Sequence, residues 1–171
     1  NERKNILINV IKDRLNIAKK YKSSTFIPAI AIHSPYSVHP FLVRETLNLA
    51  RAENLPVSSH FLESYEEFEW LHKDEGSFVE FFKNFLNQEK AVTKPMEFLN
   101  LFSNIENLSF THCVEASSDD LEKIHSLGAS INHCVTSNRF LNNSKLDLSK
   151  LSKIPFTIGT DGLSSNNSLS M

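Results

Sequence analysis

Apolar and polar residues follow two patterns along the chain, one typical of helices and one typical of strands. Residues 2–21 place apolar side chains at helical spacing between charged ones, which predicts an amphipathic helix. The next run, TFIPAIAI over 25–32, is apolar throughout, as expected of a strand covered on both faces. Residues 40–53 return to the helical pattern, with Pro40 suited to a first turn. Residues 56–59 are then predicted to form a second, short strand, so helix and strand alternate from the start.

The alternation continues to the end of the chain. Further strands are predicted over 108–111, 129–132 and 155–160. The helical segments predicted between them are Phe-rich pieces near 66–71, 78–86 and 95–102, a helix from Ser117 or Ser118 to Leu127 that Gly128 stops, and a short helix at 147–151 after a loop.

Five predicted strands each end at a His or an Asp. These residues are His33, His60, His112, His133 and Asp161. Strands that alternate with helices predict an α/β protein with a parallel sheet, either doubly wound or closed into a (β/α)8 TIM barrel. We favour the barrel, because its strand ends surround one point whereas those of an open sheet lie along a line. The chain has four Gly and no Gly-rich phosphate loop, which further disfavours a nucleotide-binding fold.

Composition narrows the class of protein. The 171 residues are 40% hydrophobic and 22% charged, with a net charge of −2. These values suit one globular domain and leave no surplus of basic residues for a nucleic-acid backbone. No apolar stretch reaches the roughly 18 residues that span a membrane. Two cysteines are typical of reduced thiols, so we expect a cytoplasmic protein without nucleic-acid or membrane partners.

His60, His112 and Asp161 are the strongest candidates for chemistry. Imidazole and carboxylate are standard ligands of divalent transition metals, which lower the pKa of bound water to about 7. A single strand-end His is more often an ordinary hydrogen-bonded residue, but its repetition favours a shared site. Glu63 lies three residues after His60 and is a candidate general acid and base. The alternative for Glu63 is a solvated loop residue.

Other polar residues near the strand ends are weaker candidates. His33 is followed by Pro35 and is either a substrate contact at the rim or a turn residue with a backbone partner. Ser137, Asn138 and Arg139 lie in the loop predicted after His133. Ser137 is a candidate substrate contact, and Asn138 is a candidate or simply a turn residue. Arg139 is either a solvated charge or a contact for an anionic group of a substrate.

Four motifs in this order resemble those of the amidohydrolase superfamily. They are SHFLES, THCVEAS, NHCVTSNRFL and IGTDGLSSNNSLSM. Together with HSPYSV they are similar to the branch that contains cytosine, guanine and adenosyl-type deaminases and triazine hydrolases. The resemblance covers nearly the whole chain. It implies a (β/α)8 barrel with one divalent metal, zinc or iron, and a small heterocyclic substrate.

The same resemblance implies a role for each motif residue. His60 binds the metal, and Asp161 binds the metal and helps to deprotonate the attacking water. Glu63 carries protons to a ring nitrogen of the substrate and contacts the substrate. His33 also contacts the substrate, and His112 contacts the attacking water. The implied reaction is hydrolytic deamination, in which water replaces an amino group and ammonia leaves. Another leaving group, such as the chloride of a triazine, is the alternative within this class.

The chain also departs from the family pattern. The family takes two further ligands from a His-x-His motif on its first strand, and this sequence contains no such motif. Its first apolar strand matches the fourth strand of the family. We therefore expect residues 1–171 to be the C-terminal part of a barrel domain, strands 4 to 8, which is inactive by itself. A non-catalytic metal-binding module is the alternative outside enzymes, and the Phe-rich insertion is a candidate homodimer interface.

Overall fold

The computed structural model describes residues 2–151 and 153–168 and contains one parallel sheet. The strands lie in the sheet in the order in which they occur in the sequence, β1-β2-β3-β4-β5. A doubly wound sheet reverses that order at a switch point, whereas a barrel does not. The predicted parallel α/β fold is therefore confirmed, with the barrel order of strands. The strands are β1 (Ile30–Ile32), β2 (Val57–Phe61), β3 (Leu108–His112), β4 (Ser130–His133) and β5 (Phe156–Ile158).

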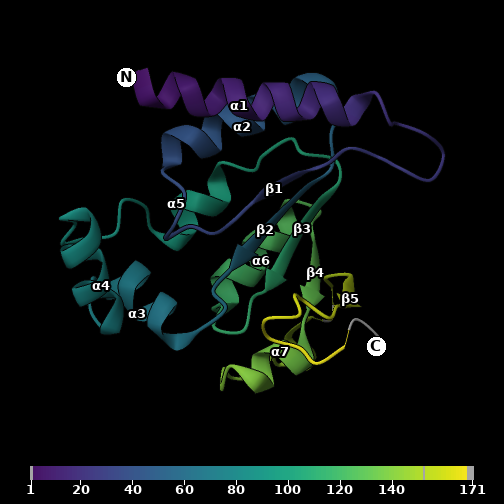
Figure 1. Ribbon diagram of the computed structural model, residues 1–171. Helices are drawn as coiled ribbons and strands as arrows, with labels where there is room; N and C mark the ends of the chain where they lie inside the picture. The colour runs from purple at the N-terminus through teal and green to yellow at the C-terminus, as the bar shows by residue number, and fades with distance from the viewer. Residues whose placement is uncertain (1, 152, 169–171) are drawn as a thin grey trace.

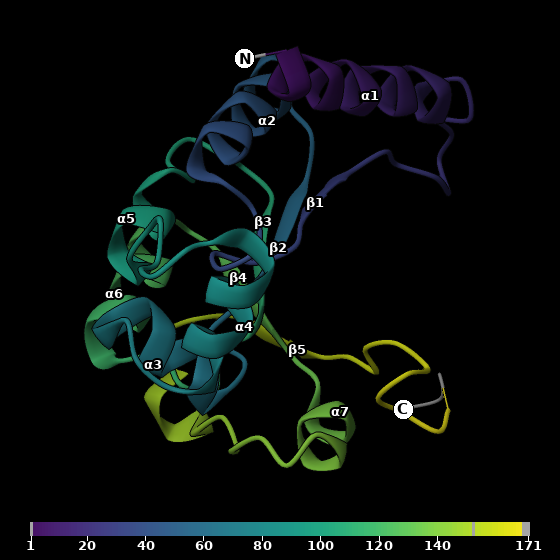
Figure 2. The same ribbon diagram turned by 60° about the vertical axis from the view of Figure 1, so that its left-hand side comes forward.

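Helices connect the strands, and α2, α5 and α6 lie on one side of the sheet in Figure 2. The carboxyl ends of the strands point to one end of the molecule, beside α7 and the C-terminal segment (Figure 1). The helices are α1 (Glu2–Lys19), α2 (Pro40–Glu53), α3 (Tyr65–Lys73), α4 (Ser77–Leu86), α5 (Pro95–Asn100), α6 (Ser118–Ser126), α7 (Val135–Phe140) and the 3-10 turn η1 (Leu148–Leu151). Among these described helices, none is long and apolar enough to cross a membrane.

The core lies between the strands and these helices. Side chains alternate in burial along β2 and β3. Phe61 and Phe110 are fully buried, whereas every second residue of each strand is half-buried. Phe110 contacts Phe102, and Phe61 stacks on Phe98. Full burial of one such side chain contributes about 1.5–3 kcal/mol. The Phe-rich insertion thus contributes Phe82, Phe98 and Phe102 to the core, whereas Phe81 and Phe85 on α4 are exposed.

Local signals define the ends of the predicted helices. Pro40 is the first residue of α2, as expected. Ser117 is the N-cap of α6, and its hydroxyl oxygen accepts from the backbone N–H of Asp120. Gly128, with φ 67°, follows the C-cap Leu127 in the left-handed region that glycine favours. These helix ends need no tertiary contact, which is why the sequence predicts them closely.

Two predictions were wrong in detail. Only Ile30–Ile32 of the TFIPAIAI run forms a strand, because its partner β2 begins at Val57, which pairs with Ile30. This strand is covered on one face, since Ile30 and Ile32 are buried and Ala31 is exposed.

The segment predicted as a loop after β4 contains a helix, α7. Its buried residues are the polar Ser137 and Asn138, whereas Val135 and Phe140 are exposed. The usual apolar helical period is therefore missing from the sequence there.

Candidate metal and acid–base site

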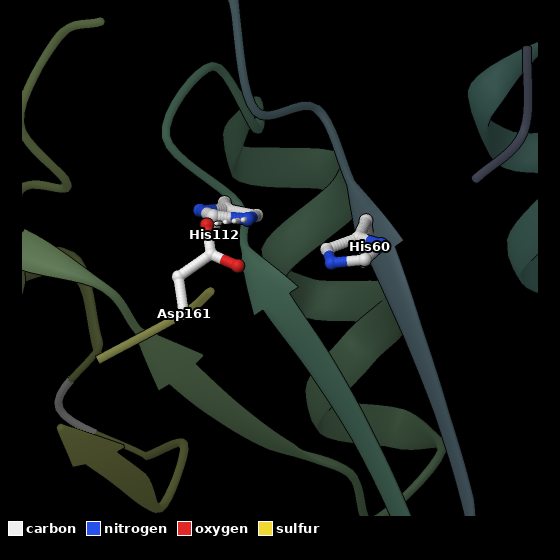
Figure 3. Close-up of side chains that lie close together, drawn as sticks. All are labelled: His60, His112 and Asp161. Atoms are coloured by element: carbon white, nitrogen blue, oxygen red, sulfur yellow. Dashed lines mark ion pairs between the residues drawn. The ribbon is translucent and has the colours of Figure 1, made fainter. Parts of the chain in front are cut away.

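His60, His112 and Asp161 meet at the carboxyl ends of the strands. His60 belongs to β2, His112 ends β3, and Asp161 follows β5. One potential ligand atom from each lies within 4.8 Å of those of the other two. Figure 3 shows the Asp161 carboxylate beside the His112 ring, with His60 on the neighbouring strand. The structure thus brings together the three residues that the sequence singled out, from segments up to 101 residues apart in numbering (161 minus 60).

His112 has an imidazole nitrogen directed at this cluster without a hydrogen bond. The side chain is 0% exposed, and its Nε2 has no hydrogen-bond partner in the described residues. Nε2 lies 3.8 Å from Asp161 Oδ2 and 3.6 Å from Glu63 Oε2. A buried polar atom of this kind normally has a partner. The unpartnered nitrogen, among one further imidazole and two carboxylates, fits a site for a divalent metal with an associated water.

The backbone at the end of β3 is in an uncommon conformation. His112 has φ 72° and Cys113 has φ 53°, values that residues other than glycine seldom adopt. Backbone strain of this kind costs about 1–3 kcal/mol per residue and concentrates at functional sites. Hydrogen bonds hold the segment, since Cys113 N–H donates to the Phe61 carbonyl at 2.8 Å. The neighbouring strand therefore fixes where the His112 ring lies, stacked 5.3 Å from the ring of His60.

The tautomer of His60 is set by a backbone carbonyl. His60 Nδ1 lies 2.8 Å from the carbonyl oxygen of His33. A carbonyl only accepts hydrogen bonds, so Nδ1 carries the proton and Nε2 of the neutral ring keeps its lone pair. Metal-binding histidines typically donate their second N–H in this way. The arrangement prepares Nε2 of His60 to be a ligand.

Asn138 fixes the tautomer of His112 in a similar way, although the sequence offered it only as a weak candidate or a turn residue. Its Oδ1 lies 2.8 Å from His112 Nδ1, and its Nδ2 lies 3.5 Å from His133 Nδ1. The amide oxygen accepts from His112 Nδ1–H, which leaves Nε2 facing the carboxylates. Asn138 is 2% exposed, because α7 turns it inward. Recognition of α7 as a helix would have been the signal needed to find it.

Replacement of Asn138 by Leu in the full-length protein is expected to lower turnover by about 10- to 100-fold, the range for residues that orient a metal-site histidine. The physical reason is that His112 loses the acceptor that fixes its tautomer. Nitrogen NMR of the His112 ring measures that tautomer directly. Asn143→Leu, at a half-buried Asn just after α7, is the control. An unchanged His112 tautomer in Asn138→Leu would contradict this role.

Asp161 is held as a carboxylate by several donors. Burial alone raises its pKa, but hydrogen bonds from Ser137 and the Gly162 N–H, the nearby His112 and the Ser165 hydroxyl lower the pKa below its usual value. Ser137 Oγ donates to Asp161 Oδ2 at 2.6 Å, and Gly162 N–H donates to Oδ1 at 2.8 Å. Ionised oxygen is the form that binds a metal. The Ser137 hydroxyl, predicted to contact substrate, is thus already engaged with Asp161.

Glu63 lies at the turn between β2 and α3 and reaches the same cluster. Its side chain is 25% exposed, and Oε2 lies 3.6 Å from His112 Nε2. The preceding residue, Leu62, has φ 44° and is fully buried. Glu63 is therefore placed between solvent and the His112 nitrogen, rather than on a solvated loop as in the alternative interpretation.

His33 borders this cluster at the end of β1. Its ring lies 5.3 Å from that of His60 and 5.8 Å from that of Tyr36. Two hydroxyls, of Ser37 at 2.5 Å and Ser34 at 3.1 Å, surround Nδ1. Burial first, and then the neighbouring His60, lower the pKa of His33, while Glu63 opposes the shift. A largely neutral, oriented imidazole thus lies at the edge of the site.

The remaining predicted residues divide between buried and exposed positions. His133 is 4% exposed, and burial, followed by the effect of His112, lowers its pKa. Cys113 and Cys134 are buried free thiols, and burial raises the pKa of both. Arg139 is exposed on α7, and its guanidinium makes no hydrogen bond or ion pair with any described residue. Arg139 is thus the one predicted site residue that the structure does not connect to the cluster of His60, His112 and Asp161.

These strand-end residues and the order of the strands define a class of barrel, and comparison with known proteins agrees. The chain belongs to the amidohydrolase family, whose model matches residues 2–171. The aminodeoxyfutalosine deaminase of Nitratiruptor sp. is 47% identical over 159 residues, which cover 93% of this chain and 39% of that protein. An adenosine deaminase of Helicobacter pylori is 36% identical over 150 residues, covering 84% of this chain and 36% of that one.

The solved structures agree with the fold. Helicobacter pylori aminofutalosine deaminase in complex with methylthio-coformycin superposes with a TM-score of 0.89 at 30% identity, over 95% of this chain and 41% of that one. The sheet and helices are thus those of part of the amidohydrolase barrel. The chain spans about two fifths of the length of these relatives.

Proposed function

We propose that residues 1–171 form the C-terminal part of a metal-dependent hydrolase barrel that deaminates an aminated purine nucleoside or related heterocycle. The observation that carries this proposal is the cluster of His60, His112 and Asp161 with the Glu63 carboxylate beside it. Metal ligands and a separate acid–base group are what hydrolytic deamination requires. The names of the similar proteins, which are deaminases, support the same reaction.

The proposed metal is one divalent ion, zinc or iron. His60 Nε2 and an Asp161 oxygen would hold it, with His112 adjacent. Nitrogen and oxygen donors of this kind suit either metal. Such an ion, when bound, lowers the pKa of a coordinated water to about 7 and so supplies a nucleophile at neutral pH.

The residues of this chain would carry out the proton transfers. Asp161, held ionised by its donors, accepts a proton from the attacking water. Glu63 carries one proton of the attacking water to a ring nitrogen of the substrate, which makes the ring carbon more electrophilic. The proton held by Asp161 then passes to the leaving amine, so both carboxylates return to their starting state. His112 Nε2, the acceptor nitrogen of the tautomer that Asn138 fixes, accepts a hydrogen bond from the attacking water. The water oxygen adds to the carbon, the C–N bond breaks and ammonia leaves.

The other predicted residues would surround the substrate. His33 contacts it at the rim through Nε2, since hydroxyls occupy Nδ1. Ser137 acts through Asp161, to which it donates. Arg139 is exposed and free to meet an anionic group on the substrate. Substrate contact by His33 and Arg139 is part of the proposal.

The particular substrate proposed is aminofutalosine, a purine nucleoside of menaquinone biosynthesis. The HFLES and GTDGLSSNNSLSM motifs resemble those of aminofutalosine deaminases, and residues 169–171 of the second motif lie outside the described residues. The Nitratiruptor and Helicobacter proteins carry names of this class. We further propose that the protein is a cytoplasmic homodimer with neither nucleic acid nor membrane as a partner.

The test is a product assay with the full-length, zinc-loaded protein. Ammonia release and an adenine-to-hypoxanthine absorbance change with aminofutalosine would support the proposal, and adenosine, 5′-deoxyadenosine, guanine and cytosine serve as comparison substrates. Chloride release from a chlorotriazine, without ammonia from any of these, would establish the alternative of a chlorohydrolase or other amidohydrolase. Metal binding without either product would favour a non-catalytic module. The isolated 171 residues are expected to show no turnover.

A further inference from the structure

A second glutamate contacts the turn that carries Glu63 and is almost fully enclosed. Glu67, in the first turn of α3, is 1% exposed. Its Oε2 accepts a hydrogen bond from the backbone N–H of Glu63 at 2.9 Å. Its Oε1 has no hydrogen-bond partner among the described residues. Burial of a carboxyl group with one oxygen unpaired is unfavourable, so this placement is costly to the fold.

The surroundings of Glu67 disfavour its charged form. Burial raises the pKa of Glu67 to about 7, against the lowering effect of hydrogen bonds from the N–H groups of Glu63 and Leu62, and the charge of Glu63 adds to the rise. Tyr36 and Cys113 also lie within its electrostatic reach. An apolar side chain of similar size would avoid this cost, which indicates that the carboxyl group has a task.

Ordinary helix capping does not account for the contact. In α6, Asp120 at the third helical position accepts from the N–H of the N-cap residue, Ser117, at 3.0 Å. In α3, Glu67 occupies the same position after the N-cap Ser64. Its carboxylate instead binds the N–H one residue earlier, that of Glu63. The bond therefore fixes the residue before the helix rather than the helix end.

The turn that Glu67 binds is under strain. Leu62 has φ 44°, a left-handed conformation that is unfavourable for a bulky side chain. Its carbonyl accepts from Glu115 N–H at 3.0 Å, and Glu67 holds the next N–H along the chain. A strained turn keeps one conformation only where its surroundings over-determine it. These two hydrogen bonds hold the turn on either side of the Leu62–Glu63 peptide.

We infer that Glu67 is a positioning residue for Glu63. By holding the Glu63 backbone, its carboxyl oxygen keeps the Glu63 carboxylate 3.6 Å from His112 Nε2. Displacement of a reacting group by 1 Å can cost about 100-fold in rate. This inference rests on the proposed function, because it takes Glu63 to be the group that transfers protons.

Two replacements in the full-length protein separate the hydrogen bond from the volume of the side chain. Glu67→Met fills the space without an acceptor, and we expect kcat to fall by about 10- to 100-fold while KM and metal content stay unchanged. Glu67→Gln keeps an amide oxygen that accepts from the Glu63 N–H, and it should retain most of the activity. The control is Asp120→Leu, which removes the buried acid of the α6 cap and is expected to reduce stability without changing kcat.

Further measurements test positioning against a general structural effect. In a Glu63→Gln background, Glu67→Met should cause no additional loss of turnover, whereas multiplied losses would overturn the inference. Equal losses in Glu67→Gln and Glu67→Met would also overturn it. Hydrogen exchange of the Glu63 amide should rise in Glu67→Met and stay protected in Asp120→Leu. This measurement needs no substrate, so it distinguishes failure of the inference from failure of the proposed function.

Discussion

Replacement of Glu63 by Gln in the full-length protein is expected to lower kcat by about 10²- to 10⁴-fold, the contribution of a positioned general acid–base group. Gln matches Glu in shape but neither accepts nor releases a proton. The side chain lies beside His112 Nε2, and it is not among the three residues whose ligand atoms cluster. Metal content should therefore remain unchanged. Steady-state kinetics together with metal analysis of the purified variant measure both quantities.

The matched control is Glu66→Gln, at an exposed Glu in the first turn of α3. It alters charge in the same segment and should leave kcat and metal content unchanged. A loss of metal from Glu63→Gln in proportion to the loss of turnover would contradict the proton-transfer role and would make Glu63 a ligand instead.

Replacement of Asp161 by Asn is expected to reduce both metal affinity and turnover, by about 100-fold or more. Loss of a direct ligand should exceed the 10- to 100-fold typical of a lost supporting residue. The hydrogen bonds from Ser137 and Gly162 are arranged around an anionic acceptor, and a neutral amide weakens both. Competition of the protein with a chelator of known zinc affinity, followed by kinetics at saturating zinc, separates the two losses.

Asp147→Asn provides the control, because Asp147 also accepts a hydroxyl hydrogen bond, from Ser149 at 2.6 Å, but is exposed and is not one of the three clustered residues. This variant should keep wild-type affinity for zinc. Unchanged zinc affinity in Asp161→Asn would refute the assignment of Asp161 as a ligand. The two predictions also form a contrast, since Glu63→Gln should lose turnover alone and Asp161→Asn should lose turnover together with metal.

The periodicity of the sequence predicted most of the architecture because helices and strands here follow local rules. Pro40 and Gly128 mark helix ends by backbone preference alone. The strands β2 and β3 are predicted from two short segments, PVSS and LSFT, each of which is followed by a His. Parallel strands bring their carboxyl ends to one edge of the sheet, so the sequence alone predicts that these residues meet.

Local patterns failed where a contact between distant segments decides the conformation. The strand at Ile30–Ile32 is short because pairing with β2 limits it. The helix α7 has no apolar period, since Ser137 and Asn138 are buried by their bonds to Asp161 and His112. A buried polar residue carries no hydrophobic signal, and so its role cannot be seen from the order of residues alone.

The sequence by itself determined which chemical groups lie at the strand ends, because strand periodicity and helix signals are properties of neighbouring residues. The tertiary structure decided how those groups are prepared. The carbonyl of His33 sets the tautomer of His60, and Asn138 sets that of His112. The Glu67 carboxyl group accepts a hydrogen bond from the Glu63 N–H and so holds the turn that carries Glu63. Each of these three hydrogen bonds depends on distances and angles between groups that are brought together by folding. The order of residues in the sequence does not specify those distances and angles.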